Sequence, residues 1–438
     1  MTVAATHPYI EALLQGSRGL PHSPADWLDA RRAQALERAN ALSVPTTRDE
    51  DWRFTDITPL TRVHFQPAQS APRLALSDIG QFMVPEAAVR LTFVDGQFAP
   101  ALSAVGGLPA GVRVSTLAEG AKSRNALLEQ HLARHVAFDN NVFAAVNTCY
   151  LRDGALVTVE KNTACAVPVH VLFVATQKEV AAYPRCLVVA ESGAECMVIE
   201  DYVSLEDGAY FNNAVTEIVA GAGARVQHVR LQRESLNAFH IGNCAVALEQ
   251  DAAYVSNTVT FGARISRYNL DVAQNGEGAE MKIDGLALIS GRQLADTHTL
   301  MAHARPNGRS AQRHKTIVDG AAHAVFSGKV FVHEGAQLTN SSQESRNLLL
   351  SGKAHVDTKP QLEIFADDVK CSHGATVGQL DAEQLFYLIS RGLSDARARG
   401  LLTYAFGAEI IDRIPVPSLV ERLEKTVLER TQGNGQQA

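Results

Sequence analysis

The chain has 438 residues, of which 46% are hydrophobic and 20% charged, an ordinary composition for a soluble globular protein. Its net charge of −7 and the lack of a long basic run argue against a nucleic-acid-binding surface. The sequence contains no run of about 18 consecutive apolar residues, which argues against a membrane-spanning helix.

The beginning of the chain and its cysteines bear on where the protein works. The first residues, MTVAATHPYIEALLQG, have no basic segment followed by an apolar one, so we predict no secretory signal. The six cysteines form no CxxC pair and are scattered, which argues against a disulfide framework. We expect the first five to be buried, reduced thiols in a cytoplasmic protein. They are Cys149, Cys165, Cys186, Cys196 and Cys244, and the sixth is Cys371.

Residues 1–140 are predicted to form an N-terminal helical and mixed α/β region. Residues 23–26 (SPAD) supply a helix cap, a proline and an acidic residue, and an apolar stripe then runs through WLDARRAQALERANAL. Charges surround Trp52 and Phe54 in the segment TTRDEDWRFTDI, which we interpret as a surface turn held by two aromatic rings. A strand at VRLTFV and a short helix at SRNALLEQHLARH complete this region.

Residues 141–378 are predicted to form a long β core. Short β-rich runs such as PVHVLFVA, CMVIEDYV and AVFSGKVFV follow one another with almost no helical period. Turns of small residues separate them at intervals of about 26 to 30 residues, a period typical of solenoids. Because no helices lie between the strands, a doubly wound α/β sheet is excluded. We therefore predict a β-helix or β-solenoid, with an ordinary β-sandwich as the alternative.

Residues 379–432 return to a helical pattern. A first helix begins after Asp381 and ends at Gly392, and two more helices follow. Residues 433–438 are expected to form a disordered tail. Such a helical unit, attached to the end of a solenoid, would serve as its cap or as a docking surface. The apolar face of the first helix is predicted to contain Leu385, Leu388 and Ile389.

Few motifs in the sequence carry chemistry. There is no GxSxG, HExxH, Walker A or strand-linked GxGxxG motif. Cys371 and His373 lie two residues apart in a predicted strand, so the thiol and the imidazole would project from one face. They supply half of a metal site, although their spacing alone leaves a structural role open. A weaker candidate lies among the five histidines between 298 and 333, because stacked coils could bring His303 close to His333.

Three blocks of the sequence resemble the SufB/SufD family of the SUF iron–sulfur cluster assembly system. The blocks are DWRFTDI, SGKVFVHEGAQLTNSSQESRNLLLSGKAHVDTKPQLEIFADD and VKCSHGATVGQLDAEQLFYLISRGL. The resemblance covers residues 52–414. It implies a mainly β fold, with a right-handed parallel β-helix core between an N-terminal helical region and a C-terminal helical domain. This agrees with the pattern of the residues.

The resemblance also implies partners. In this family SufB pairs with SufD through the last strands of the β-helix, and the C-terminal helical domain docks the ABC-type ATPase SufC. The expected complex contains one SufB, two SufC and one SufD. SufB carries a cysteine before its match to LLLSG, where this chain has Arg346-Asn347, and a His-Glu pair where this chain has His373-Gly374. The chain therefore resembles the SufD branch, whose role is that of a non-enzymatic scaffold in iron acquisition and cluster assembly.

The resemblance assigns candidate roles to individual residues. Cys371 and His373 are predicted iron ligands at the SufB–SufD interface, shared with the partner, and His373 is the stronger candidate because a buried interface thiol is a fair alternative for Cys371. No tightly bound cofactor is expected in the isolated chain, and iron or a cluster would be transient in the complex. Binding of reduced flavin stays open, as does the choice between monomer and homodimer for the isolated chain. The predicted SufC contacts are Glu383, Gln384, Tyr387 and Arg391.

Two other functions remain as alternatives. The solenoid shape alone would suit a β-helix enzyme that acts on polysaccharide, but the sequence shows neither a signal peptide nor an acidic ladder along a groove. The chain could also be a purely structural solenoid in which the Cys371–His373 pair has no chemical role.

Overall fold

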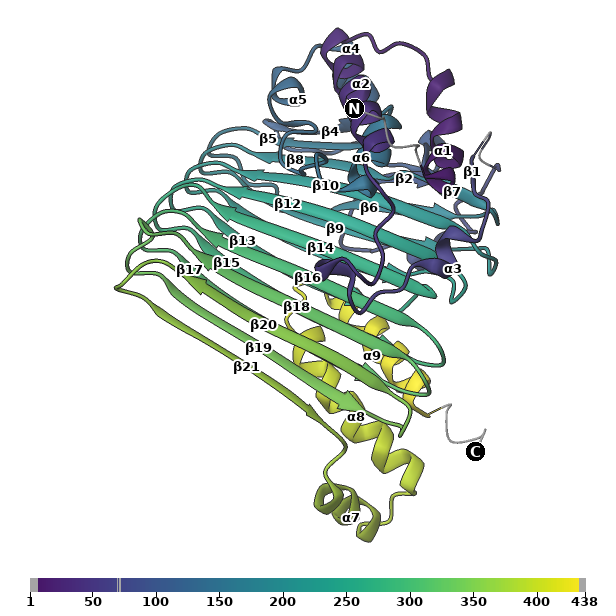
Figure 1. The fold of residues 1–438 in the computed structure, drawn as a ribbon, viewed down its shortest axis with the longest axis vertical. Helices are drawn as coiled ribbons and strands as arrows, with labels where there is room; N and C mark the ends of the chain where they lie inside the picture. The colour runs from purple at the N-terminus through teal and green to yellow at the C-terminus, as the bar shows by residue number, and fades with distance from the viewer. Residues whose placement is uncertain (1–6, 69, 71, 433–438) are drawn as a thin grey trace.

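The computed structural model describes residues 7–68, 70 and 72–432, so the tail predicted to be disordered, 433–438, lies outside the described residues. Two sheets whose strands pair mainly in parallel face each other (Figure 1). From Val169 onward the chain passes largely alternately from one sheet to the other. Helices from the N-terminal and C-terminal parts of the chain pack on the outer faces of this β core. The fold is the predicted parallel β-helix. The alternative of an ordinary β-sandwich is wrong, because successive coils pair in parallel and sandwiches are built from antiparallel strands.

The two sheets, called sheet A and sheet B here, each collect strands from successive coils. Within the described residues, the main path of sheet A contains β4 (Val112–Thr116), β5 (Ala155–Val159), β8 (Arg185–Ala190), β10 (Phe211–Ala220), β12 (Phe239–Leu248), β14 (Ile265–Gln274), β16 (Leu294–His303), β18 (His323–Val332) and β20 (His355–Ile364). Off this path, β1 (Gln66–Pro67) pairs with β7 (Val180–Ala182). Sheet B contains β3 (Gln97–Phe98), β2 (Val89–Val94), β6 (Val169–Ala175), β9 (Glu195–Ser204), β11 (Arg225–Arg233), β13 (Ala253–Thr260), β15 (Glu280–Ile289), β17 (Arg309–Val318), β19 (Asn340–Leu349) and β21 (Lys370–Gly378).

The interior between the sheets is the main hydrophobic core. Alternate residues of each strand point inward, so a residue and its neighbours in register on adjacent coils form columns such as Val226–Tyr254–Met281. The first five cysteines are buried and free, as predicted, and four of them contribute to this core. Cys149 is the exception, since it ends a helix under the N-terminal layer.

The N-terminal helices cover the outer face of sheet A. They are α1 (Pro8–Leu14), α2 (Asp26–Ala41), α3 (Thr58–Thr61), α4 (Leu117–Lys122), α5 (Ala126–His131) and α6 (Val142–Cys149). The layer packs through aromatic contacts such as Phe143 against Phe211, whose ring centroids lie 6.1 Å apart. Helix α2 begins at Asp26 with Ala25 as its cap, and Ser23, the predicted cap residue, instead accepts a hydrogen bond from the Ala25 N–H.

The segment around Trp52 is held against the sheet as a turn, as predicted. The Trp52 ring lies 5.7 Å from the ring of Phe143, and the guanidinium of Arg267 lies 4.0 Å above it. The second anchor is Thr55, whose hydroxyl donates to Asp296 at 2.6 Å. The ring of Phe54, the other aromatic residue of the predicted turn, is half-buried like that of Trp52.

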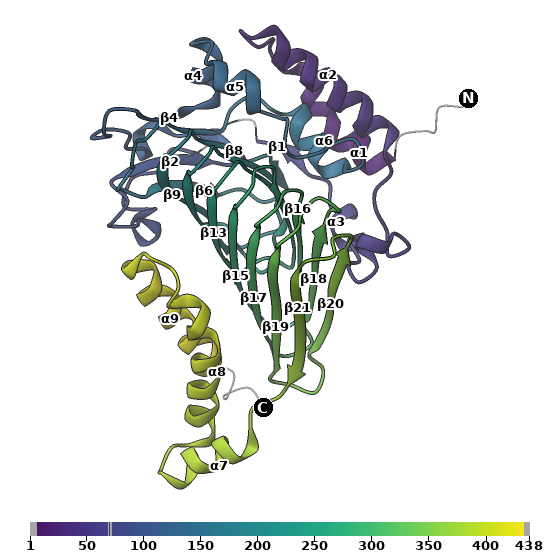
Figure 2. The same cartoon turned by 90° about the vertical axis from the view of Figure 1, so that its left-hand side faces the viewer.

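The C-terminal helices are α7 (Ala382–Ser390), α8 (Asp395–Ile411) and α9 (Pro417–Gln432). The sequence predicted that these helices would extend from the end of the solenoid, and the structure differs. Helices α8 and α9 turn back along the outer face of sheet B, and α7 alone projects past the last coil (Figure 2). The reason is apolar burial, since Ile410 and Val427 pack against outward-facing residues of sheet B such as Leu286. Among the described residues, no helix is long and apolar enough to cross a membrane.

Candidate functional site at the open end of the β-helix

The last coil leaves the β-helix open at one end. In the described part of the chain, β20 pairs only with β18 and β21 only with β19, so each sheet ends on a free strand edge. Most of β21 is exposed to solvent, and the apolar side chain of Val377 is 49% exposed. A long exposed strand edge with unpaired N–H and C=O groups is a template for pairing with another chain. The end of the solenoid is therefore a surface suited to a partner strand.

Cys371 and His373 lie on this open edge. In the register of the sheet, Cys371 is opposite Ser341 and His373 is opposite Gln343. Ser341 and Gln343 are buried inward-facing residues, so the Cys–His pair continues an inward column and shares one face. Cys371 is half-buried against the interior core, and its burial raises the pKa of its thiol. His373 is exposed.

Among the described residues, one group of three potential metal ligands has its ligand atoms within 4.8 Å of one another. It consists of His323, His355 and Asp357, which the sequence patterns did not bring together. Cys371 and His373 do not belong to such a group and remain a pair. The predicted neighbours His303 and His333 do not form a metal site, because the buried His303 ring bonds to Gln274 and Ser310 at 2.7 and 2.9 Å and His333 is exposed beside Phe331.

The predicted ATPase contacts all lie on the exposed surface of α7 and its end. Glu383, Gln384, Tyr387 and Arg391 are exposed, and the Arg391 guanidinium lies 5.2 Å from the centre of the Tyr387 ring. Helix α7 contains no buried residue. Sequence reasoning missed that Phe386 is 73% exposed and placed Ile389 on an inward face, although Ile389 is also exposed. The helix therefore presents an apolar surface with charged residues around it.

The interior of the β-helix becomes polar toward the open end, a feature that the sequence reasoning did not identify. His314 on β17 is buried beside Phe326, with ring centroids 4.5 Å apart. A Cβ added to Gly285 would lie 2.3 Å from Nδ1 of His314, so the ring requires glycine at that position. Burial lowers the pKa of His314 to about 3 and that of His303 to about 4.

These two histidines predict that the protein loses stability in mild acid. Both are neutral in the folded protein, whereas unfolded histidine binds a proton below a pH of about 6.5. The unfolded chain thus holds more protons between pH 6.5 and 4, and stability falls as the pH drops through that window. At pH 5 each histidine should remove roughly 2 kcal/mol from the free energy of unfolding. Urea unfolding at pH 7 and pH 5 measures the difference.

Single variants separate the effect of these histidines from that of other groups. His314→Gln should lose roughly 2 kcal/mol less than the parent protein between pH 7 and pH 5. His22→Ala, which changes an exposed side chain, should show the parent's full loss. Equal losses in His314→Gln and the parent would contradict this account.

The fold and its open coil define a class of protein: a parallel β-helix with an exposed terminal coil that can associate through its strand edges. Sequence comparison identifies the family. Residues 173–406 match the SufBD core domain of SUF-system FeS cluster assembly, and residues 4–171 match the SufBD protein N-terminal region. The chain belongs to the SufBD family of iron–sulfur cluster assembly proteins.

Named relatives place the chain close to SufD. An iron–sulfur cluster assembly SufBD family protein of Synechocystis is 41% identical over 92% of this chain and 90% of its own length. The iron–sulfur cluster assembly protein SufD of Escherichia coli is 33% identical over 91% of this chain and 92% of its own length. SufD of Bacillus subtilis is 27% identical over 93% and 95%, respectively. The resemblance to SufD found from the sequence is confirmed.

Proposed function

We propose that this chain is the SufD-type subunit of an iron–sulfur cluster assembly complex and acts as a scaffold without enzymatic activity of its own. The observation that carries the proposal is the open last coil, where exposed strand edges lie beside Cys371 and His373. A ligand pair at an unpaired strand edge suits a site that a second chain completes. That chain would be SufB, and it would continue the sheets by strand pairing.

Iron, or a nascent cluster, is the cargo at this edge. His373 is the stronger ligand candidate because its ring is exposed, whereas the Cys371 thiol is partly buried with a raised pKa and must lose its proton to bind a metal. Iron–sulfur clusters are held mainly by thiolates, and histidine ligands alter their properties. A site that includes histidine and depends on two chains suits a cluster that must later be released. Binding of reduced flavin stays a prediction.

SufC would dock on α7. The exposed Phe386 and Tyr387 offer aromatic area, and Glu383, Gln384 and Arg391 surround it with polar groups, a composition typical of the energetic centre of protein interfaces. We expect the complex to work in the cytoplasm. ATP-driven dimerisation of two SufC subunits would then act on α7 and open the SufB interface.

Co-purification tests both interfaces separately. The full chain, co-expressed with SufB and SufC from one organism, should retain both partners. Tyr387→Asp should weaken SufC binding by about 2 kcal/mol, roughly 30-fold, and keep SufB, because Tyr387 would be a contact of the ATPase alone. Val377→Asp, on the inward face of β21, should lose SufB and keep SufC.

A matched surface variant controls for nonspecific effects. Leu236→Asp changes an exposed residue in a loop far along the β-helix and should keep both partners. If the chain retained neither partner, or if Tyr387→Asp and Leu236→Asp behaved alike, the proposed docking arrangement would be wrong.

A further inference from the structure

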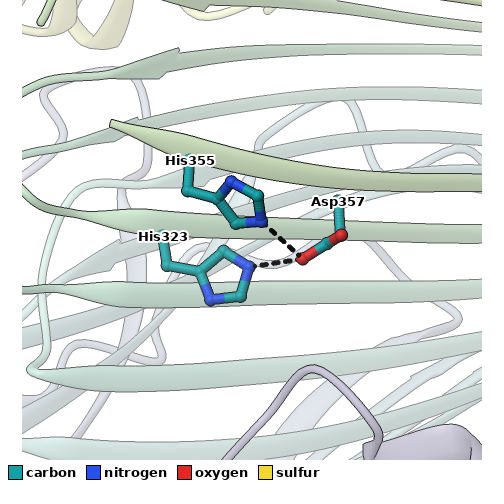
Figure 3. Close-up of side chains that lie close together, drawn as sticks. All are labelled: His323, His355 and Asp357. Atoms are coloured by element: carbon teal, nitrogen blue, oxygen red, sulfur yellow. Dashed lines mark hydrogen bonds and ion pairs between the residues drawn. The ribbon is translucent and has the colours of Figure 1, made fainter. Parts of the chain in front are cut away.

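Two histidines and an aspartate converge on the outer face of sheet A, beside the open end (Figure 3). His323 on β18 is directly opposite His355 on β20, and Asp357 follows His355 by two residues on the same face. Nε2 of His323 lies 2.8 Å from Oδ2 of Asp357, and Nε2 of His355 lies 3.2 Å from that same oxygen. Three potential ligand atoms therefore point to one place.

This group is both rigid and accessible. The two strands that carry it pair in register along their whole length, and the imidazole ring centroids are 4.8 Å apart. The side chains of His323, His355 and Asp357 are 27%, 64% and 25% exposed. Ligands on paired strands keep their geometry better than ligands on loops, and partial exposure leaves a path for an ion to enter.

Other histidine–carboxylate contacts in the described residues differ from this group. Several of them are fully buried and join one imidazole to one carboxylate. A direct contact between the two side chains is enough to explain such a pair, without a bound ion. At Asp357 two imidazoles share a single carboxylate oxygen at the surface. The fully buried pairs are His170 with Asp201, His228 with Glu200 and His240 with Glu234.

We propose that His323, His355 and Asp357 bind a first-row divalent transition-metal ion. Two imidazole nitrogens and one carboxylate oxygen suit ions such as Zn²⁺ and Fe²⁺, whereas Mg²⁺ and Ca²⁺ prefer oxygen ligands alone. Three protein ligands leave coordination positions for water or for a group from a neighbouring chain. The site lies on sheet A, and Cys371 and His373 lie on sheet B, so the two sets of ligands are separate.

Titration with Co²⁺ tests the site in the full-length protein, since bound Co²⁺ gives a visible absorption band that reports its ligands. The parent should bind one Co²⁺ that Zn²⁺ displaces. His323→Ala and Asp357→Asn should each weaken binding at least tenfold, because even the loss of a group behind a metal ligand costs about 10- to 100-fold. Asp357→Asn keeps the size of the side chain and a hydrogen-bond acceptor, so it should fold normally.

Two control proteins locate the bound ion. His131→Ala removes one ring of a stacked histidine pair in which Nδ1 of His131 lies 3.2 Å from Nε2 of His135, and it should bind Co²⁺ like the parent. The double variant Cys371→Ala with His373→Ala should also keep this binding. As an independent readout, Zn²⁺ should raise the melting temperature of the parent but not of Asp357→Asn. Unchanged Co²⁺ affinity in His323→Ala and Asp357→Asn, or its loss only in the double variant, would overturn the proposal.

Discussion

Replacement of His373 with alanine is expected to abolish cluster formation on the assembled complex while leaving the complex itself intact. The ring is exposed on the edge strand β21, so its removal opens no cavity in the fold. As an iron ligand, it should lower the cluster yield at least tenfold when lost, because even the loss of a group behind a metal ligand costs about 10- to 100-fold. Anaerobic reconstitution with iron and sulfide, followed by acid-labile sulfide analysis, measures the yield, and size-exclusion chromatography measures assembly.

Ser372→Ala is the matched control for His373→Ala. Ser372 is adjacent on the same strand and is also exposed, but it pairs with Ser342 on the outward face. Its cluster yield should equal that of the parent. Cys371→Ser separates a thiolate ligand from a packing role, because only a ligand role predicts a lower cluster yield in an intact complex. An unchanged cluster yield in His373→Ala would show that His373 is not an iron ligand.

Replacement of Glu217 with alanine is expected to cause the largest loss of stability among single variants of the N-terminal half. Its fully buried carboxylate on β10 lies 2.6 Å from Nη2 of Arg185. It also accepts hydrogen bonds from the four successive backbone N–H groups of residues 133–136 at 2.7 to 3.1 Å. Burial acts to raise the pKa of Glu217, but Arg185 and these N–H groups outweigh it and lower the pKa.

The variant Glu217→Ala leaves Arg185 buried and charged without its partner. Loss of one member of a buried ion pair costs about 3 to 5 kcal/mol. Urea unfolding measures the loss, and Arg225→Ala, which breaks the exposed pair with Glu195, should change stability by at most about 1 kcal/mol. The lowered pKa of Glu217 also means that its contribution is present above the unfolded pKa of about 4.3 and is lost as the pH falls below it. A loss in Glu217→Ala no larger than in Arg225→Ala would disprove this role.

The β core was predictable because each coil repeats the same local pattern. The run AVFSGKVFV, for example, lies entirely within β18, and small-residue turns bound it in the sequence. The position of the C-terminal helices was not predictable, since an apolar stripe through Ile410 and Val427 shows that a helix is buried but not what covers it. The residues that cover this stripe, such as Leu286, lie on strands that are apolar on both faces. The sequence therefore does not distinguish the inward residues of these strands from the outward ones.

The two sets of potential metal ligands also differ in whether the sequence could predict them. Cys371 and His373 were found because both lie on one strand, where spacing alone determines which face a side chain occupies. The group around Asp357 was missed because it depends on the register between two coils, which turn lengths set. Stacking by a simple period does bring His333 beside His303, since the His333 N–H donates to the His303 carbonyl at 2.9 Å. Their side chains do not share a site, because the register places Val332 opposite His303, whereas it places His355 opposite His323.

The path of α8 and α9 has a mechanical consequence for any load applied at α7. Helix α7 is joined directly to the free edge strand β21, but α8 also bonds to sheet B, where Glu409 accepts from Lys315 at 2.5 Å. Farther along, Ser418 donates to Glu86 of the N-terminal region. A pull on α7 is therefore shared between the last coil and the opposite end of the molecule. The short link between β21 and α7 is thus one of two routes by which such a load would reach the β-helix, and the contacts of α8 and α9 are the other.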